Sequence, residues 1–163
     1  MQIRYRGEAC GDLAWQQSAQ APAIAPTLEL FEAATCRNAD TGACTKVAVF
    51  FVTGRFDSPE ARGWTEKNLT NAGYQGWTDL YMRDPATRGG PVSDHKSAAR
   101  VDIERKGFTI IANIGDQISD LTGGHSERTF KVPNPFLLYS LGALSVRNPA
   151  DFGADGGRRP SAS

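Results

Sequence analysis

Residues 46–55 read Lys-Val-Ala-Val-Phe-Phe-Val-Thr-Gly-Arg, and this stretch decides the fold. The unbroken run of β-branched and aromatic residues over 47–52 is typical of a strand buried on both faces. A hydroxyl and a glycine follow it directly, at Thr53 and Gly54. A second apolar run over 108–114 predicts another buried strand, and it too is followed by a glycine and an acid.

Helical segments lie between these runs. Ser58 and Pro59 suit the start of a helix, and Gly73 and Gly107 suit helix ends. Strands that alternate with helices predict an α/β protein with a Rossmann-like parallel sheet and helices on both faces. We expect helices over 26–34, 58–72 and 93–106, with short strands over 79–83 and 129–132.

Length and charge limit the classes of partner. A chain of 163 residues suits one domain, which we expect over 1–148, with a disordered tail over 149–163. Basic and acidic residues both number 18, so no basic surplus indicates nucleic-acid binding. The longest strongly apolar run, 47–52, falls far short of the roughly 20 residues that a membrane helix needs. We therefore expect neither a nucleic-acid nor a membrane partner.

The first residues and the cysteines bear on the compartment. Residues 1–8 carry early positive charge without the apolar stretch of a secretory signal, so we expect the chain as written to be cytoplasmic. Cys10, Cys36 and Cys44 have no metal-binding spacing. Cys36 and Cys44 can bridge the polar loop between them in an oxidising compartment, or remain thiols; we favour thiols.

Polar residues at the expected strand ends form a candidate site, because ligands of parallel sheets bind beyond the carboxyl ends of the strands. Thr53 and Gly54 can donate to phosphate oxygens, although such a tripeptide is often only a turn. Asp116 and Asp120 suit Mg²⁺, or else a helix cap and a solvated acid. Lys96 can neutralise a phosphate, or be an exposed helix lysine. His95 and His125 are interpreted as surface residues, outside the site.

Four segments in order carry a resemblance to a known family. They are FFVTGR at 50–55, SDHKSAAR at 93–100, IIANIGDQISDL at 110–121 and RTFKVPNPF at 128–136. Together they resemble the haloacid dehalogenase-like superfamily, and within it the acid phosphatases of the plant and class B type. The resemblance covers about residues 23–136.

This resemblance implies a role for each candidate residue. Thr53 is similar to the hydroxyl that binds the phosphoryl group, with Gly54 beside it, and Arg55 would help to shape the pocket. Lys96 is similar to the lysine that holds the phosphoryl oxygens and the nucleophile together. Asp116 is similar to a direct Mg²⁺ ligand and Asp120 to its supporting acid.

The family's first motif is missing from this sequence. That motif, Asp-x-Asp at the end of a central first strand, carries the nucleophile, and no Asp-x-Asp occurs in the 163 residues. We interpret the chain as a partial one in which residues 1–21 are the remnant of an insert. Without the central strand, two apolar strand edges would be exposed and could support a homo-oligomer.

The resulting hypothesis is a Mg²⁺-dependent phosphomonoesterase acting on a small phosphomonoester, with Thr53 and Lys96 as catalytic residues. Lacking the nucleophilic carboxylate, this chain alone is expected to be inactive. The alternative is a non-catalytic phosphate-binding, storage or interaction protein of the same fold. Members of the family are commonly secreted or periplasmic, unlike the chain as written.

Overall fold

The computed structural model describes residues 11–37 and 44–133. Contacts divide the chain into two units, 1–131 and 132–163, and every helix and strand described lies in the first. The elements are α1 (Asp12–Ser18), α2 (Ala25–Ala34), β1 (Phe50–Phe56), α3 (Pro59–Asn71), β2 (Asp79–Arg83), a 3-10 turn (Pro85–Thr87), α4 (Val92–Arg105), β3 (Asn113–Gly115), α5 (Ile118–Leu121) and β4 (Thr129–Lys131).

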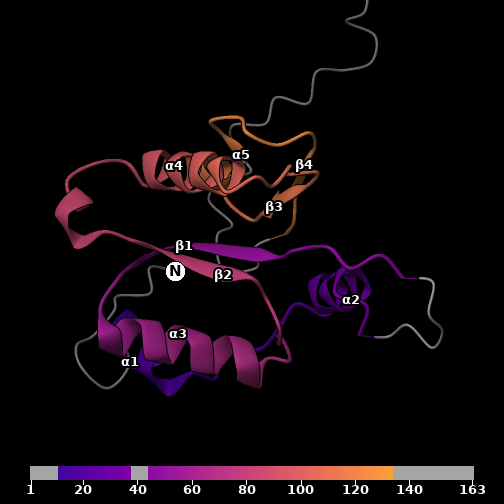
Figure 1. Cartoon of the computed structure of the whole chain (residues 1–163). Helices are drawn as coiled ribbons and strands as arrows, with labels where there is room; N and C mark the ends of the chain where they lie inside the picture. The colour runs from indigo at the N-terminus through magenta and orange to yellow at the C-terminus, as the bar shows by residue number, and fades with distance from the viewer. Residues whose placement is uncertain (1–10, 38–43, 134–163) are drawn as a thin grey trace, which may run out of the picture. The chain divides into compact units, whose positions relative to one another are not determined.

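The strands pair in parallel, which confirms the α/β class. β1 pairs with β2, and β3 pairs with β4. Figure 1 shows α3 and α1 on one side of the β1–β2 pair and α4 on the other, so helices cover both faces. β1 is thus placed between two helical layers, with its carboxyl end near the start of α4.

The two strand pairs are separate sheets. Within the described residues no strand joins β1 to β3, and each sheet contains only two strands. The absence of the family's central first strand stays a prediction. Association through strand edges stays a prediction.

β1 begins later and runs further than the sequence predicted. Residues 47–49 do not join the strand: the amide of Val47 donates to the carbonyl of Ala34 at 2.8 Å, at the end of α2. The strand then continues through Thr53, Gly54 and Arg55 to Phe56. All seven strand residues are half-buried rather than fully buried, because β2 is the only strand that pairs with β1 in the described part of the chain.

The predicted strand over 108–114 is mostly wrong. Only residues 113–115 form strand β3, because its partner β4 offers just three residues for pairing. The prediction of burial on both faces also fails: Phe108, Ile111 and Ile114 are 38%, 50% and 40% exposed. Apolar sequence predicts a buried strand only where neighbours exist to cover it.

Aromatic side chains pack on opposite faces of β1, and Phe31 is the buried one among them. Phe51 contacts Phe31, Tyr74 and Trp77, with ring centres 5.4–6.0 Å apart. Phe50 contacts Tyr81 and Phe108 on the other face. The alternation follows from the two-residue period of a strand, and it fixes which face of β1 looks toward α4.

The helix signals in the sequence are largely confirmed. Ser58 caps α3 by accepting from the amide of Ala61 at 3.1 Å, and Gly73 and Gly107 adopt the positive φ of helix ends. α4 begins one residue earlier than predicted, after Pro91 and with no side-chain cap. A proline's fixed φ already suits the entry to a helix, so no cap is required.

Cys36 and Cys44 form a disulfide, so the expectation of free thiols is wrong for this pair. Their α-carbons lie 5.8 Å apart, within the usual range for a bridge. No helix in the described part of the chain is long and apolar enough to cross a membrane. Cys10, residues 1–10 of the predicted insert remnant and the predicted tail lie outside the described residues, and the domain bounds stay predictions.

Candidate functional site

The tripeptide Thr53–Gly54–Arg55 lies in an irregularity of the β1–β2 ladder. Val52 pairs with Tyr81 and Phe56 pairs with Arg83, so four steps along β1 match only two along β2. Extra residues in one strand form a bulge, which frees main-chain groups from the ladder. The predicted phosphate-binding residues therefore project from the strand rather than following its end.

α4 begins directly over this bulge. A β-carbon on Gly54 would lie 2.9 Å from Cγ2 of Val92, so only glycine lets the helix approach this closely. His95, one turn along α4, places Nε2 3.0 Å from the carbonyl oxygen of Thr53. His95 is half-buried, so its interpretation as a surface residue is wrong. Burial lowers the pKa of His95, and the nearby cations Arg83 and Lys96 lower it further.

Lys96, the residue after His95, extends away from the bulge toward the segment that follows β3. Its ammonium donates to the carboxylate of Asp120 and, at 3.2 Å, to the hydroxyl of Ser119. The side chains of Lys96 and Asp120 are 8% and 15% exposed. Lys96 is therefore not an exposed helix lysine, and Asp120 is not a solvated acid. One turn of α4 contacts both the bulge of β1 and the segment after β3.

Asp120 also organises its own helix. Its second carboxylate oxygen accepts from the amide of Gln117 at 2.8 Å, and the two residues form a capping box at the start of α5. The side chain folds back over Gly115, where an added β-carbon would lie 2.1 Å from Cβ of Asp120. The glycine in this sequence pattern is thus required by the position of Asp120.

Arg100 holds the segment that follows Asp120. It lies one helical turn after Lys96 and is only 4% exposed. Its guanidinium donates to the carbonyls of Asp120 at 3.1 Å, Gly124 at 2.7 Å and Thr122. Burial lowers its pKa, while Asp120 raises it. Sequence analysis did not single out Arg100, although its spacing of four from Lys96 puts both cations on one face of the helix.

The acids predicted to hold Mg²⁺ do not form a complete metal site. Among residues 11–37 and 44–133, no group of three metal-ligating side chains comes together. Both oxygens of Asp120 are engaged, one by the lysine cation and the other by a main-chain amide. A cation next to a carboxylate disfavours a second cation there by charge repulsion. Asp116 is half-buried, and its carbonyl accepts from Lys131 at 3.3 Å. These residues do not fit Mg²⁺ by themselves.

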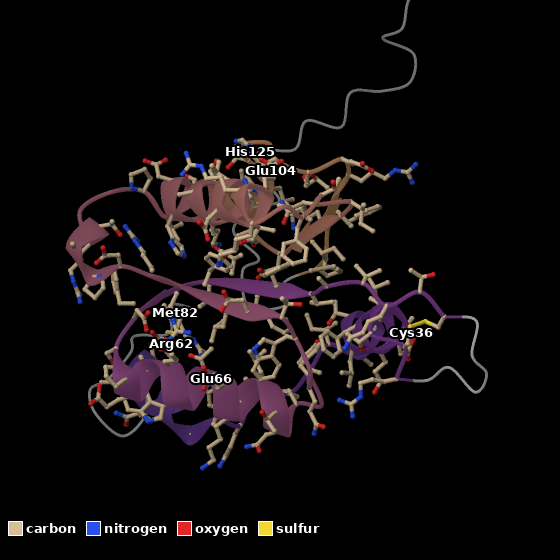
Figure 2. The ribbon with its side chains drawn as sticks, viewed as in Figure 1. Cys36, Arg62, Glu66, Met82, Glu104 and His125 are labelled. Carbon is tan, nitrogen blue, oxygen red and sulfur yellow. A yellow bond between two sulfur atoms is a disulfide. The ribbon has the colours of Figure 1, made fainter. Side chains whose placement is uncertain are left out.

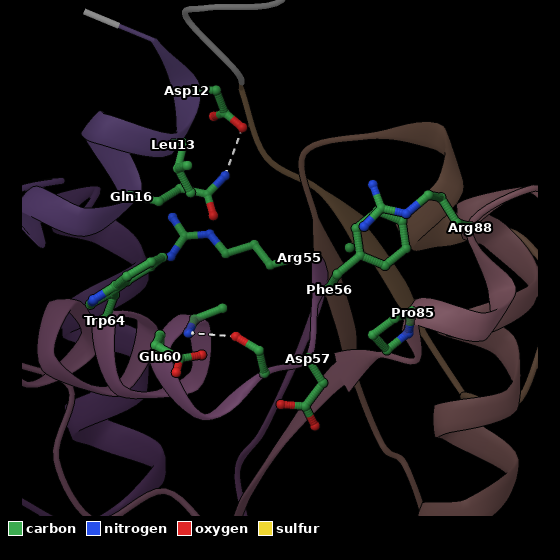
Figure 3. Close-up of a pocket in the computed structure, with 13 residues that line it drawn as sticks. Asp12, Leu13, Gln16, Arg55, Phe56, Asp57, Glu60, Trp64, Pro85 and Arg88 are labelled. Atoms are coloured by element: carbon green, nitrogen blue, oxygen red, sulfur yellow. Dashed lines mark hydrogen bonds between the residues drawn. The ribbon is translucent and has the colours of Figure 1, made fainter. Parts of the chain in front are cut away.

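A cavity of about 800 Å³ opens on the other side of the bulge (Figure 3). Figure 3 shows the guanidinium of Arg55 lying between Gln16 and Trp64. Arg55 also donates to the hydroxyl of Thr65 at 3.1 Å, and burial lowers its pKa. Arg88 lies over the ring of Phe56 at 4.3 Å. Gly54 and Arg55 line this cavity, whereas Thr53, Lys96, Asp116 and Asp120 do not.

The candidate residues thus fall into three groups. Lys96 and Asp120 are in contact, Thr53 is joined to the same turn of α4 through His95, and Arg55 faces the cavity. The convergence of Thr53, Lys96 and Asp116 on one ligand stays a prediction. His95 carried no sequence signal, because its partner is a main-chain atom 42 residues away.

The parallel strands with helices on both faces define an α/β protein, whose candidate site contains the bulged Thr53–Gly54–Arg55 and the buried Lys96–Asp120 pair. A family model described as HAD superfamily, subfamily IIIB (Acid phosphatase) matches residues 12–140. The chain belongs to this family, which confirms the resemblance found in the sequence.

The similar proteins include a stem glycoprotein, an acid phosphatase and a vegetative storage protein. The chain is 36% identical to a stem 31 kDa glycoprotein of Glycine max over 82% of this chain and 44% of the relative. It is 36% identical to acid phosphatase 1 of Solanum lycopersicum over 78% of this chain and 46% of that relative. It is 37% identical to vegetative storage protein 1 of Arabidopsis thaliana over 44% of this chain and 26% of that relative. The chain spans less than half the length of these relatives.

Proposed function

We propose that this chain carries the phosphate-binding part of a phosphomonoesterase of the acid phosphatase type. The observation that supports it best is the bulge in β1, which places Thr53 and Gly54 beside the turn of α4 that carries Lys96, while Arg55 extends from the same bulge into the cavity. A hydroxyl, an open main chain and a cation are groups that bind phosphoryl oxygens. The name of the tomato relative points to the same chemistry.

The hydroxyl of Thr53 has the role of a donor in this proposal. Its oxygen accepts from the amide of Arg55 at 3.3 Å, which orients the hydroxyl and leaves its proton for a ligand. Lys96 would supply positive charge, which Asp120 partly offsets. Mg²⁺ dependence would require oxygen ligands beyond Asp116, and we assign no step to the metal.

Hydrolysis requires an attacking carboxylate that no Asp-x-Asp in this sequence provides. We propose that the 163-residue chain binds phosphate and barely hydrolyses phosphomonoesters, as a part of a longer enzyme would. The alternative is a non-catalytic phosphate-binding, storage or interaction protein. The absent Asp-x-Asp and the names of the Arabidopsis relatives favour it.

Binding of inorganic phosphate tests the proposal. We expect phosphate to shift the amide signals of Thr53 and Gly54 in nuclear magnetic resonance (NMR) spectra. Thr53→Val should weaken binding at least about tenfold, since it loses a hydrogen bond to a charged group. Thr70→Val is the matched control, because Thr70 is exposed on α3 and bonds only within its helix. Equal binding by both variants would exclude Thr53 from the site.

Hydrolysis of p-nitrophenyl phosphate separates the two functions. An enzyme without its covalent nucleophile can lose turnover by a factor on the order of 10⁶. We expect the short chain to be inactive, and a longer chain carrying Asp-x-Asp to be active. Inactivity of both, with phosphate binding intact, would favour the non-catalytic alternative.

A further inference from the structure

The carbonyl of Thr53 has a partner outside the sheet. Thr53 lies within the bulge between Val52 and Phe56, where the regular pairing with β2 is interrupted. The imidazole of His95 contacts its carbonyl, with Nε2 3.0 Å from the Thr53 oxygen. The bulge therefore has a side-chain support that comes from α4.

The hydrogen bond determines the form of the imidazole. A carbonyl oxygen can only accept, so Nε2 of His95 must carry the proton. The ring also interacts with the main chain of Tyr81 on β2, and the charged groups near it are Arg83 on β2 and Lys96 on α4. Burial and these two cations lower the pKa of His95, which favours a neutral ring that donates from Nε2.

We propose that His95 is a positioning residue for Thr53: it holds the bulged main chain so that the Thr53 hydroxyl faces the phosphoryl group. The effect of His95 on phosphate binding rests on the proposed function, whereas the contact between His95 and Thr53 does not. Thr53 is then fixed at two atoms, its carbonyl by His95 and its hydroxyl oxygen by the amide of Arg55.

The same bond sets the distance between the two phosphate-binding groups. His95 and Lys96 are consecutive, so the imidazole that fixes Thr53 also fixes the turn of α4 from which Lys96 extends. Val92, packed against Gly54, is the second contact between this turn and the bulge. Loss of the imidazole would remove the hydrogen bond between this turn and the bulge and leave the apolar contact of Val92.

Two substitutions of His95 distinguish its role as a hydrogen-bond donor from the packing of its ring. In His95→Gln the side-chain amide reaches about as far as Nε2 and can donate to Thr53, whereas in His95→Asn it is too short. We expect Asn to weaken the binding of inorganic phosphate about fivefold, the value of one ordinary hydrogen bond, and Gln to stay within twofold of the wild type. His125→Asn is the control, because His125 is an exposed residue paired with Glu104 (Figure 2).

A second measurement tests the geometry without any ligand. Nitrogen NMR of the full chain should find the His95 ring neutral with its proton on Nε2. In His95→Asn, the carbonyl carbon shift and side-chain rotamer of Thr53 should change, while His95→Gln should restore both. A proton on Nδ1, or a Thr53 signal that Asn leaves unchanged, would overturn the inference.

The outcomes distinguish this inference from the proposed function. Phosphate binding that Asn leaves unchanged overturns the positioning role and leaves phosphate binding intact. A wild-type chain that binds no phosphate overturns the proposed function, and the Thr53 signals then decide whether His95 holds the bulge. A loss of binding that Gln fails to rescue would show that the ring acts by packing alone, which also overturns the inference.

Discussion

The ammonium of Lys96 contacts the carboxylate of Asp120 where both side chains are mostly removed from solvent, at 8% and 15% exposure. The pair joins the first half of α4 to α5, and its acid also caps α5 through Gln117. Each charge is stable there only because the other is present. The contribution of this pair to the free energy of unfolding can be measured.

Removal of the cation should destabilise the protein strongly. Lys96→Met leaves Asp120 as an unpaired, largely buried charge, which we expect to lower the free energy of unfolding by about 3 kcal/mol. Urea denaturation measures the change. Lys67→Met, at an exposed position of α3, should stay within about 0.5 kcal/mol. Equal effects of the two variants would mean that the buried pair does not form in solution.

Arg100→Lys should loosen the segment after Asp120. One ammonium cannot reach three carbonyls arranged for a planar guanidinium, so we expect a loss of roughly 2 kcal/mol. Hydrogen exchange at the Thr122 amide, which donates to Ile118 at 3.1 Å, should accelerate. Arg105→Lys, at an exposed position of the same helix, is the control. Unchanged exchange at Thr122 would contradict the role given to Arg100.

Two glycine substitutions should change stability in opposite directions. Gly115→Ala would bring a β-carbon to 2.1 Å from Asp120 and should cost about 2–3 kcal/mol. Gly63→Ala meets nothing within 4 Å inside α3 and should stabilise the protein by about 0.5–1 kcal/mol. Thermal denaturation of the Gly115→Ala and Gly63→Ala variants measures both changes in stability. A neutral Gly115→Ala would show that Asp120 does not fold back over this position.

The disulfide predicts a specific thiol count. The chain has three cysteines, so alkylation of the unfolded, unreduced protein should modify one thiol, and reduction should expose all three. Mass spectrometry distinguishes these products. Cys36→Ser with Cys44→Ser should lower the free energy of unfolding by about 2 kcal/mol, as expected for a short closed loop. Three alkylated thiols without reduction would mean that the bridge is not formed.

Acid should weaken the fold through His95. Burial, Arg83 and Lys96 lower the pKa of its folded form below the ordinary value of 6.5. As the pH falls below 6.5 the unfolded chain takes up the proton first, so stability declines from there until the folded ring is also protonated. His95→Gln should flatten this part of the curve of stability against pH, whereas His125→Asn should not. An unchanged slope in His95→Gln would place the acid sensitivity elsewhere.

The sequence predicted three of the helices and the two short strands over 79–83 and 129–132 well, but the two long apolar strands poorly, for different physical reasons. The start of α3 at Ser58 and its end near Gly73 are encoded by the residues at those positions. The burial of residues 108–114 depends on neighbouring strands, which no local pattern reports. Residues 108–112 read as a strand and yet stay outside the ladder, because β4 is too short to pair with them.

The candidate site shows the same division. The order of the four segments was enough to identify the family, and Lys96, which the sequence analysis named, is largely buried and in contact with Asp120. Asp120 was assigned to a metal because two acids four residues apart suggest one. The structure pairs it with Lys96 and Gln117 instead, and those contacts depend on how α4 packs. His95 acts on a main-chain atom, for which sequence offers no pattern.

The separation of the two strand pairs affects how the molecule loses its structure. β1–β2 and β3–β4 share no ladder, and α4 contacts both β1 and the α5 segment beside β3. Cooperative unfolding requires that one part cannot open without raising the free energy of the other. α4 carries much of this coupling, through His95 on one side and Lys96 and Arg100 on the other, and Phe50 of β1 adds a direct contact with Phe108 ahead of β3. We therefore expect this helix to make the two small sheets unfold together.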